Sequence, residues 1–60
     1  MCVEFVGGPL DGMRVRIILP ILTVAHRTNS GTLHYYRKTM RFVDEYVVYE
    51  YMGIMIAEEV

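Results

Sequence analysis

The chain has 60 residues, six of them Lys or Arg and seven Asp or Glu, and a formal net charge of −1. Such a balance excludes binding to nucleic acid through overall charge alone. The longest apolar run, Ile17 to Leu22, is far shorter than the roughly 20 residues of a membrane-spanning helix. The residues before Phe5 include an acid and no base, unlike a secretory leader. We therefore expect a cytoplasmic protein without membrane contact.

The chain has few means of stabilising so small a domain by itself. Domains of this length bury only about 60% of the surface of the unfolded chain, and they commonly gain stability from disulfides, metals or oligomerisation. Cys2 is the one cysteine, so no disulfide forms within the chain, and His26 and His34 lie too far from it in sequence to suggest a metal site. Because 53% of the residues are hydrophobic, the composition predicts a homo-oligomer without metal.

The stretch VGGPLDG lies between two runs with period-two alternation, Cys2 to Phe5 and Met13 to Ile17, which predict half-buried strands. Proline sets φ for the second residue of a turn, and glycine supplies a positive φ where a turn ends. A four-residue hairpin loop from Pro9 to Gly12, with Gly12 left-handed, is therefore predicted, and a two-residue turn at Asp11-Gly12 is the alternative. The structural turn residues are Gly8, Pro9, Asp11 and Gly12.

The same glycines do not predict a phosphate-binding loop. Such loops lead from a strand into a helix and carry a lysine and a hydroxyl, whereas the residues MRVRII after Gly12 alternate like a strand. Asp11 would also repel a phosphate group.

The segment after Ile17 is expected to leave the strand. Pro20 cannot donate to a central ladder, so the strand should end or bulge near Leu19, or run at an edge of the sheet. The polar, glycine-ended residues from His26 to Gly31 predict a loop.

Residues 33–43 allow two interpretations. Leu33, Tyr36 and Met40 have helical spacing, whereas the aromatic and β-branched content favours a strand. Residues 46–52 favour a strand more clearly, and a turn at 43–45 would join two antiparallel strands. We predict an all-β fold, a small antiparallel sheet of three to four strands arranged as a β-meander. The alternative is an α+β fold with a helix at about residues 33–43; either would be a single domain of residues 1–60, frayed at 57–60.

The stretch HYYRKTMR, residues 34–41, holds three of the six Lys and Arg residues. On a strand, Tyr35, Arg37 and Arg41 would share one face, whereas on a helix His34, Lys38 and Arg41 would cluster. Arginines beside a tyrosine can bind phosphate while the ring stacks on a base. Cross-strand pairing of Arg37 or Arg41 with Asp44 or Glu50 is the alternative. The candidate ligand-binding residues are His34, Tyr35, Tyr36, Arg37, Lys38 and Arg41.

Apolar and aromatic residues are candidates for subunit contacts. The apolar run and the tail after Gly53 would be costly to leave in water, and tyrosine is favoured at interfaces. On a strand, Tyr49 and Tyr51 share a face opposite Tyr46, and a place in the core is the alternative for these tyrosines. Arg14 and Arg16 indicate instead a solvated edge that discourages aggregation. The candidate interface residues are Ile18, Leu19, Ile21, Leu22, Tyr49, Tyr51, Ile54 and Ile56.

No group of residues predicts catalysis. Asp44 and Glu45 are adjacent and would point to opposite sides of a strand, while Glu58 and Glu59 are close to the end of the sequence. A small sheet offers little concave surface for a pocket. We therefore expect neither catalytic residues nor a cofactor.

Three short motifs resemble a group of uncharacterised proteins from bacteriophages and prophage regions. They are the GGPxDG turn at residues 7–12, the segment from His34 to Arg37, and the closing VYEY strand at residues 48–51. The resemblance covers most of the chain but not the apolar run or the tail after Gly53. The group has no established activity, so the resemblance implies a small accessory protein in a host cytoplasm rather than a mechanism.

These observations predict a non-enzymatic, oligomeric protein-interaction module whose partner would be a host protein. The alternative is an oligomer that binds a nucleotide or nucleic acid through residues 34–41 and counters host defence. A minor virion or assembly component is a third class.

Overall fold

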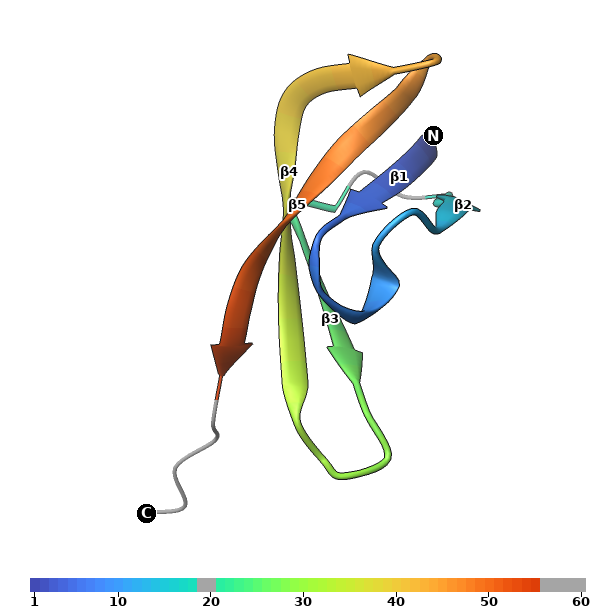
Figure 1. The fold of residues 1–60 in the computed structure, drawn as a ribbon. Coiled ribbons are helices and arrows are strands. Elements are labelled where there is room, and N and C mark those ends of the chain that lie inside the picture. The colour runs from blue at the N-terminus through green and yellow to red at the C-terminus, as the bar shows by residue number, and fades with distance from the viewer. Residues whose placement is uncertain (19–20, 56–60) are drawn as a thin grey trace.

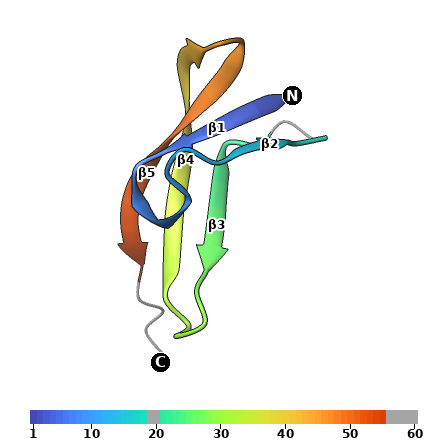
Figure 2. The ribbon, with the colours of Figure 1, turned by 45° about the vertical axis from the view of Figure 1, so that its right-hand side comes forward.

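The computed structural model describes residues 1–18 and 21–55, which form one five-stranded sheet with the order β2-β1-β5-β4-β3 (Figures 1 and 2). β1 (Cys2–Val6) pairs antiparallel with β2 (Arg14–Arg16) and parallel with β5 (Tyr46–Met55). A 3₁₀ turn, Gly8–Leu10, connects β1 to β2 and is the one helical element of the described residues.

The other half of the sheet is antiparallel. β4 (Leu33–Val43) pairs with β5 on one side and with β3 (Thr23–Arg27) on the other. The chain therefore passes from β2, at one edge of the sheet, to β3, at the opposite edge. This crossing places β5 between β1 and β4, where it runs parallel to β1.

The all-β prediction is confirmed, with three differences in detail. The sheet has five strands instead of three or four, and it is mixed, so it is not a β-meander. The alternative of a helix at residues 33–43 is wrong, because β4 spans this whole segment and residues 33–37 have paired strands on both sides. Thr23–Arg27 is also a strand, so the predicted loop from His26 begins two residues too early. The predicted end of the second strand near Leu19 falls partly outside the described residues, and β2 already ends at Arg16.

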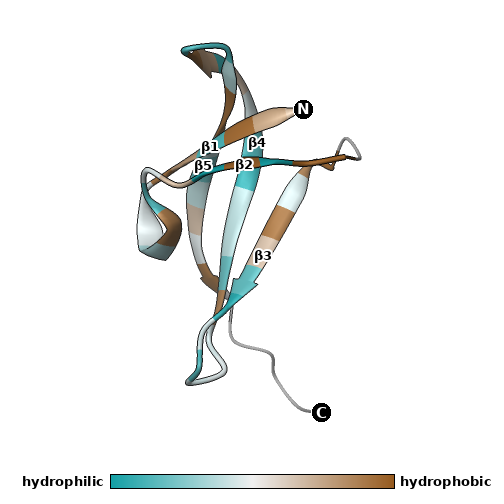
Figure 3. Cartoon of the chain, turned by 90° about the vertical axis from the view of Figure 1, so that its right-hand side faces the viewer, coloured by the Kyte–Doolittle hydropathy of each residue, from teal (hydrophilic) through white to brown (hydrophobic). Residues whose placement is uncertain are grey.

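One face of the sheet carries the core. Val3, Phe5, Tyr36, Val47 and Tyr49 are buried together, and the side chains around them are Leu10, Val15, Ile17, Val24 and Tyr51. We call this side the core face. The ring of Phe5 meets those of Tyr36 and Tyr49 edge-on, at centroid distances of 4.8 and 5.9 Å, an arrangement that adds to simple burial of apolar area. Figure 3 shows hydrophobic colour in β1 and in the segment after β2, and hydrophilic colour in the β3–β4 loop.

A buried tyrosine ties the connection after β2 to the core. The Tyr49 hydroxyl donates to the carbonyl of Ile21, and burial raises the pKa of Tyr49 above its ordinary value. The hydroxyl therefore keeps its proton and remains a donor. Leu22 accepts a backbone hydrogen bond from Lys38 at 2.9 Å, so the connection reaches β4 as well.

The VGGPLDG stretch forms a loop that packs against two tyrosines. The Tyr36 hydroxyl donates to the carbonyl of Gly7 at 2.7 Å and accepts from the amide of Leu10 at 2.8 Å. A Cβ on Gly8 would lie 2.5 Å from the ring of Tyr51 and 2.6 Å from the Tyr36 oxygen, so only glycine fits there. β1 and β2 form the predicted hairpin, and Gly12 has the expected positive φ of 82°. The loop is longer than the predicted four residues from Pro9 to Gly12, because β1 ends at Val6 and β2 begins at Arg14.

The pairing of β4 with β5 is interrupted where β4 bulges. Lys38 pairs with Tyr49, and Phe42 pairs with Val47. Between these two pairs, β4 contains two more residues than β5. The Thr39 hydroxyl donates to the carbonyl of Val48 at 2.8 Å and so occupies a carbonyl in the interrupted part of the ladder. Bulges bend the strand that carries them, and β4 curves over at its end in Figure 1.

Replacing Tyr36 with Phe should destabilise the protein by about 1–3 kcal/mol, since it removes the shared partner of a carbonyl and an amide. The measurement is the free energy of unfolding in urea. The matched control is Tyr35→Phe, whose hydroxyl makes no hydrogen bond to the described residues; it should change stability by less than about 0.5 kcal/mol. Equal effects of the two variants would contradict the anchoring role of Tyr36.

Replacing Glu45 with Gly should stabilise the protein by about 0.5–1 kcal/mol. Asp44 and Glu45 both have positive φ, 49° and 70°, as in type I′ hairpin turns, where glycine is preferred at the second position. The relief of backbone strain exceeds the extra entropy that glycine gives the unfolded chain. The control is Asn29→Gly in the other hairpin turn, where φ is not positive and glycine should destabilise. A loss of stability in the Glu45 variant would contradict the turn geometry.

Candidate functional site

The strand registers place four of the five arginines on the side opposite the core, and an ion pair with Glu50 places Arg41 there as well. Arg14 and Arg16 pair with Glu4 and Cys2, which alternate along β1 with the buried Val3. Residues paired across neighbouring strands share a face. We call this side the arginine face; it carries Arg14, Arg16, Arg27, Arg37 and Arg41.

The other half of the sheet adds its arginines by the same alternation. Arg37 pairs with Thr23 on β3 and with Glu50 on β5, next to the buried Tyr36 in sequence. Arg27 pairs with Leu33, two residues before Tyr35 on β4. The sheet therefore brings arginines from β2, β3 and β4 to one surface.

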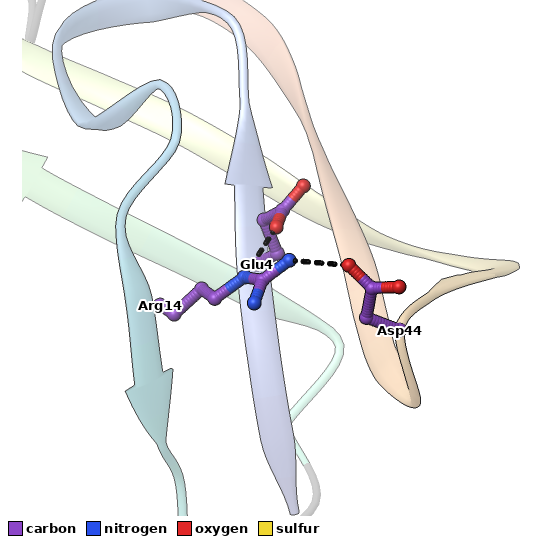
Figure 4. A network of polar contacts seen from close by, with 3 residues as sticks. All are labelled: Glu4, Arg14 and Asp44. Carbon is purple, nitrogen blue, oxygen red and sulfur yellow. Dashed lines mark hydrogen bonds and ion pairs between the residues drawn. The ribbon is translucent and has the colours of Figure 1, made fainter.

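Arg14 binds two carboxylates on this face, those of Glu4 and Asp44 (Figure 4), and it also contacts one aromatic ring. Its Nε lies 2.6 Å from Oε1 of Glu4, and its Nη2 lies 3.0 Å from Oδ2 of Asp44 in the β4–β5 turn. The guanidinium carbon is 4.3 Å from the centre of the Tyr46 ring, which is a cation–π distance. The hydrogen bonds to Glu4 and then to Asp44 raise the pKa of Arg14 above its ordinary value. Arg14 thus connects β2 to β1, to the β4–β5 turn and to the start of β5 by side-chain contacts.

A second ion pair lies near the centre of the face. Nη2 of Arg41 is 2.8 Å from Oε2 of Glu50, which confirms one of the predicted cross-strand partners. No carboxylate of the described residues is within ion-pair distance of Arg16, Arg27 or Arg37.

Tyr35 lies between two of these unpaired arginines. On β4 it is two residues from Arg37, and Arg27 is the diagonal neighbour on β3. The residues paired with Tyr35 are Ala25 on β3 and Gly53 on β5, so neither cross-strand partner has a large side chain beside the ring. We call Arg27, Tyr35 and Arg37 the Tyr35 platform.

The six predicted ligand-binding residues do not form one site. Tyr36 is buried and binds the loop, while His34 is on the core side, where its Nδ1 is 2.9 Å from the Tyr51 hydroxyl. Lys38 pairs with the buried Tyr49 and is also on the core side. Tyr35, Arg37 and Arg41 are the members that reach the arginine face.

Sequence reasoning missed Arg27, because the segment that contains it was expected to be a loop. The available signal was the position of Arg27 at the end of TVAHR, a run with strand-forming residues. Only the pairing of β3 with β4 brings it next to Tyr35.

The predicted interface residues fall into an exposed group and a buried or half-buried group. Ile18 and Leu22 are 91% and 74% exposed, and Ile21 and Ile54 are exposed as well. Tyr49 is fully buried, so its assignment to an interface is wrong, and Tyr51 is half-buried against the loop. Leu19 and Ile56 lie outside the described residues. Sequence reasoning missed two apolar side chains on β4, Met40 and Phe42, which are 92% and 66% exposed.

The described part of the chain has neither a metal-binding cluster of side chains nor a membrane-spanning helix. No group of three or more His, Cys, Asp or Glu side chains there could hold a metal ion. No helix among the same residues is long and apolar enough to cross a membrane. No protein-family model, curated protein or solved structure matches the chain. The resemblance to phage proteins therefore stays a prediction.

Replacing Arg14 with Gln should loosen β2 while the rest of the sheet keeps its protection. The Ile17 amide, which donates to the carbonyl of Met1 at 2.8 Å, should exchange with solvent about two to five times faster, the range expected for a weak exposed network. The measurement is amide hydrogen exchange by NMR. Arg16→Gln removes the same charge from the same strand without breaking an ion pair, and it should leave that rate unchanged. Equal rates in both variants would contradict the role of Arg14.

Proposed function

We propose that this chain is a non-enzymatic interaction module that self-associates through an apolar rim made of Leu22, Met40 and Phe42. The observation that carries the proposal is the exposure of these three side chains. Met40 is almost fully exposed, although methionine is otherwise a common core residue. Large apolar side chains that together form an exposed patch commonly mark a site of contact with another molecule.

The rim follows one edge of β4. Leu22 lies beside Lys38 through their backbone hydrogen bond, and Met40 and Phe42 follow along the strand. β3 pairs with β4 only as far as Arg37, so this edge of β4 has no strand neighbour beyond Lys38 in the described part of the chain. The bulge at Thr39 disrupts the regular edge, which disfavours backbone pairing between copies. Side-chain burial is therefore the supported mode of contact.

The energetics favour association of moderate strength. Burying a Leu, Met or Phe side chain contributes about 1.5–3 kcal/mol each. Association costs at least several kcal/mol in lost rotational and translational freedom. Ile18 and Ile21, also exposed, precede the rim in sequence and would extend the buried area.

The biological setting belongs to the same proposal. The GGPxDG turn and the VYEY strand support a phage-type accessory protein that acts in a host cytoplasm, where a host protein could take the place of the second copy at the rim. An apolar rim suits either partner, because burial of apolar area is not directional.

Replacing Met40 with Glu should weaken self-association by about tenfold or more, which corresponds to 1.4 kcal/mol. A charge at the rim would have to be buried unpaired in the contact. The measurement is sedimentation velocity over a wide range of protein concentrations.

The matched control is Met52→Glu, the same change at an exposed methionine on β5, away from the rim. It should leave the association constant unchanged. A wild-type chain that sediments as a monomer at all concentrations would refute the proposal, and so would equal loss in both variants.

A further inference from the structure

We propose that the arginine face binds single-stranded nucleic acid, with a base stacked on Tyr35 and phosphates held by Arg27 and Arg37. This inference goes beyond the proposed self-association and rests on different residues. It depends on three observations: the positive charge of the face, the lack of an ion-pair partner for Arg27 and Arg37 among the described residues, and the small residues paired with Tyr35.

The described charged residues of the arginine face are mostly basic. Five arginines lie on the arginine face, and the carboxylates that contact it are Glu4, Asp44 and Glu50. Among the described residues, this face therefore has two more arginines than contacting carboxylates. The footprint of a nucleic-acid-binding protein is a local positive surface of this kind, because phosphate contacts depend on nearby charge.

Two arginines of this face flank a half-buried aromatic ring, that of Tyr35. Arg27 and Arg37 have no ion-pair partner among the described residues, so their guanidinium groups can form bidentate bonds with phosphate oxygens. The cross-strand partners of Tyr35 are Ala25 and Gly53, so neither covers the exposed part of its ring with a large side chain, and a flat base could stack there. Stacking on an aromatic side chain next to arginines is the usual mode of binding to unpaired strands.

The position of Tyr35 in the sheet favours a single strand over a duplex. β4 has β3 on one side and β5 on the other at this point. A major groove about 12 Å wide admits two strands of a sheet, whereas three strands spaced about 4.8 Å apart, with their side chains, are too wide. Bases of a duplex are also stacked on each other and cannot cover Tyr35. A single strand laid across the face meets both requirements.

The test is fluorescence anisotropy with a labelled oligothymidylate at low salt, repeated over a salt series. The wild-type chain should bind this probe more tightly than a duplex of the same length. Arg27→Gln and Arg37→Gln should each lower the slope of log affinity against log salt by about one. Tyr35→Leu should weaken binding by roughly fivefold to a hundredfold and leave the slope unchanged.

The matched control is Lys38→Gln, the same loss of charge on the core side of β4, which should bind like the wild type. Tyr35→Phe keeps the ring and should also bind like the wild type. Amide NMR spectra identify any variant that fails to fold, and a folded Arg37→Gln variant alone is sufficient for the test. Absence of binding at low salt, tighter binding to the duplex, equal loss in Lys38→Gln, or equal competition by polyglutamate would each overturn the proposal.

Discussion

The hydroxyl of Tyr36 is the point on which the two halves of the structure depend. Its ring is in the core, and a buried phenol needs hydrogen-bond partners. Those partners, Gly7 and Leu10, lie in the loop between β1 and β2, 29 and 26 residues away in sequence. The bond therefore fixes the first hairpin to β4 across β5. It also explains why Gly8 has no side chain, since the loop must come within contact distance of two tyrosine rings. In the described part of the chain, every buried side-chain nitrogen or oxygen atom has a hydrogen-bond partner, and the Tyr36 hydroxyl is among them.

Local patterns were sufficient to predict contacts between sequence neighbours. Alternation identified the first hairpin and the shared face of Tyr49 with Tyr51, and opposite charges nearby in sequence identified the pair of Arg41 with Glu50. The parallel pairing of β1 with β5 and the passage from β2 to β3 have no local signal, because they depend on which strands meet after the chain has crossed the sheet. The position of Arg27 beside Tyr35 is a consequence of this passage. Sequence reasoning therefore found two of the three residues of the Tyr35 platform, the two that lie on β4.

The bulge in β4 connects the fold to both candidate surfaces. Up to Lys38 the strand alternates regularly, so its even-numbered residues face the core and its odd-numbered residues join the arginine face. The two extra residues interrupt this alternation until Phe42 pairs with Val47, and within the interruption the Thr39 hydroxyl donates to the carbonyl of Val48. Met40 consequently projects into solvent, although the unbroken alternation would have turned it toward the core. The rim thus begins where the regular part of the arginine face ends.

Burial alone explains where the arginines are, but not why three of them have no ion-pair partner among the described residues. A guanidinium on the core face would lose hydration without compensation, so the arginines are expected on the opposite side. The chain nevertheless has acids that could have balanced them. Asp11 is used within the loop, where it accepts from the amide of Gly7 at 2.7 Å, and Glu45 occupies a turn position that glycine would fill with less strain. Acids placed there do not contact Arg27 or Arg37. Neighbouring like charges lower stability slightly. Two arginines that no described carboxylate neutralises, on either side of the half-buried ring of Tyr35, therefore fit a ligand that carries negative charge better than they fit the needs of the fold.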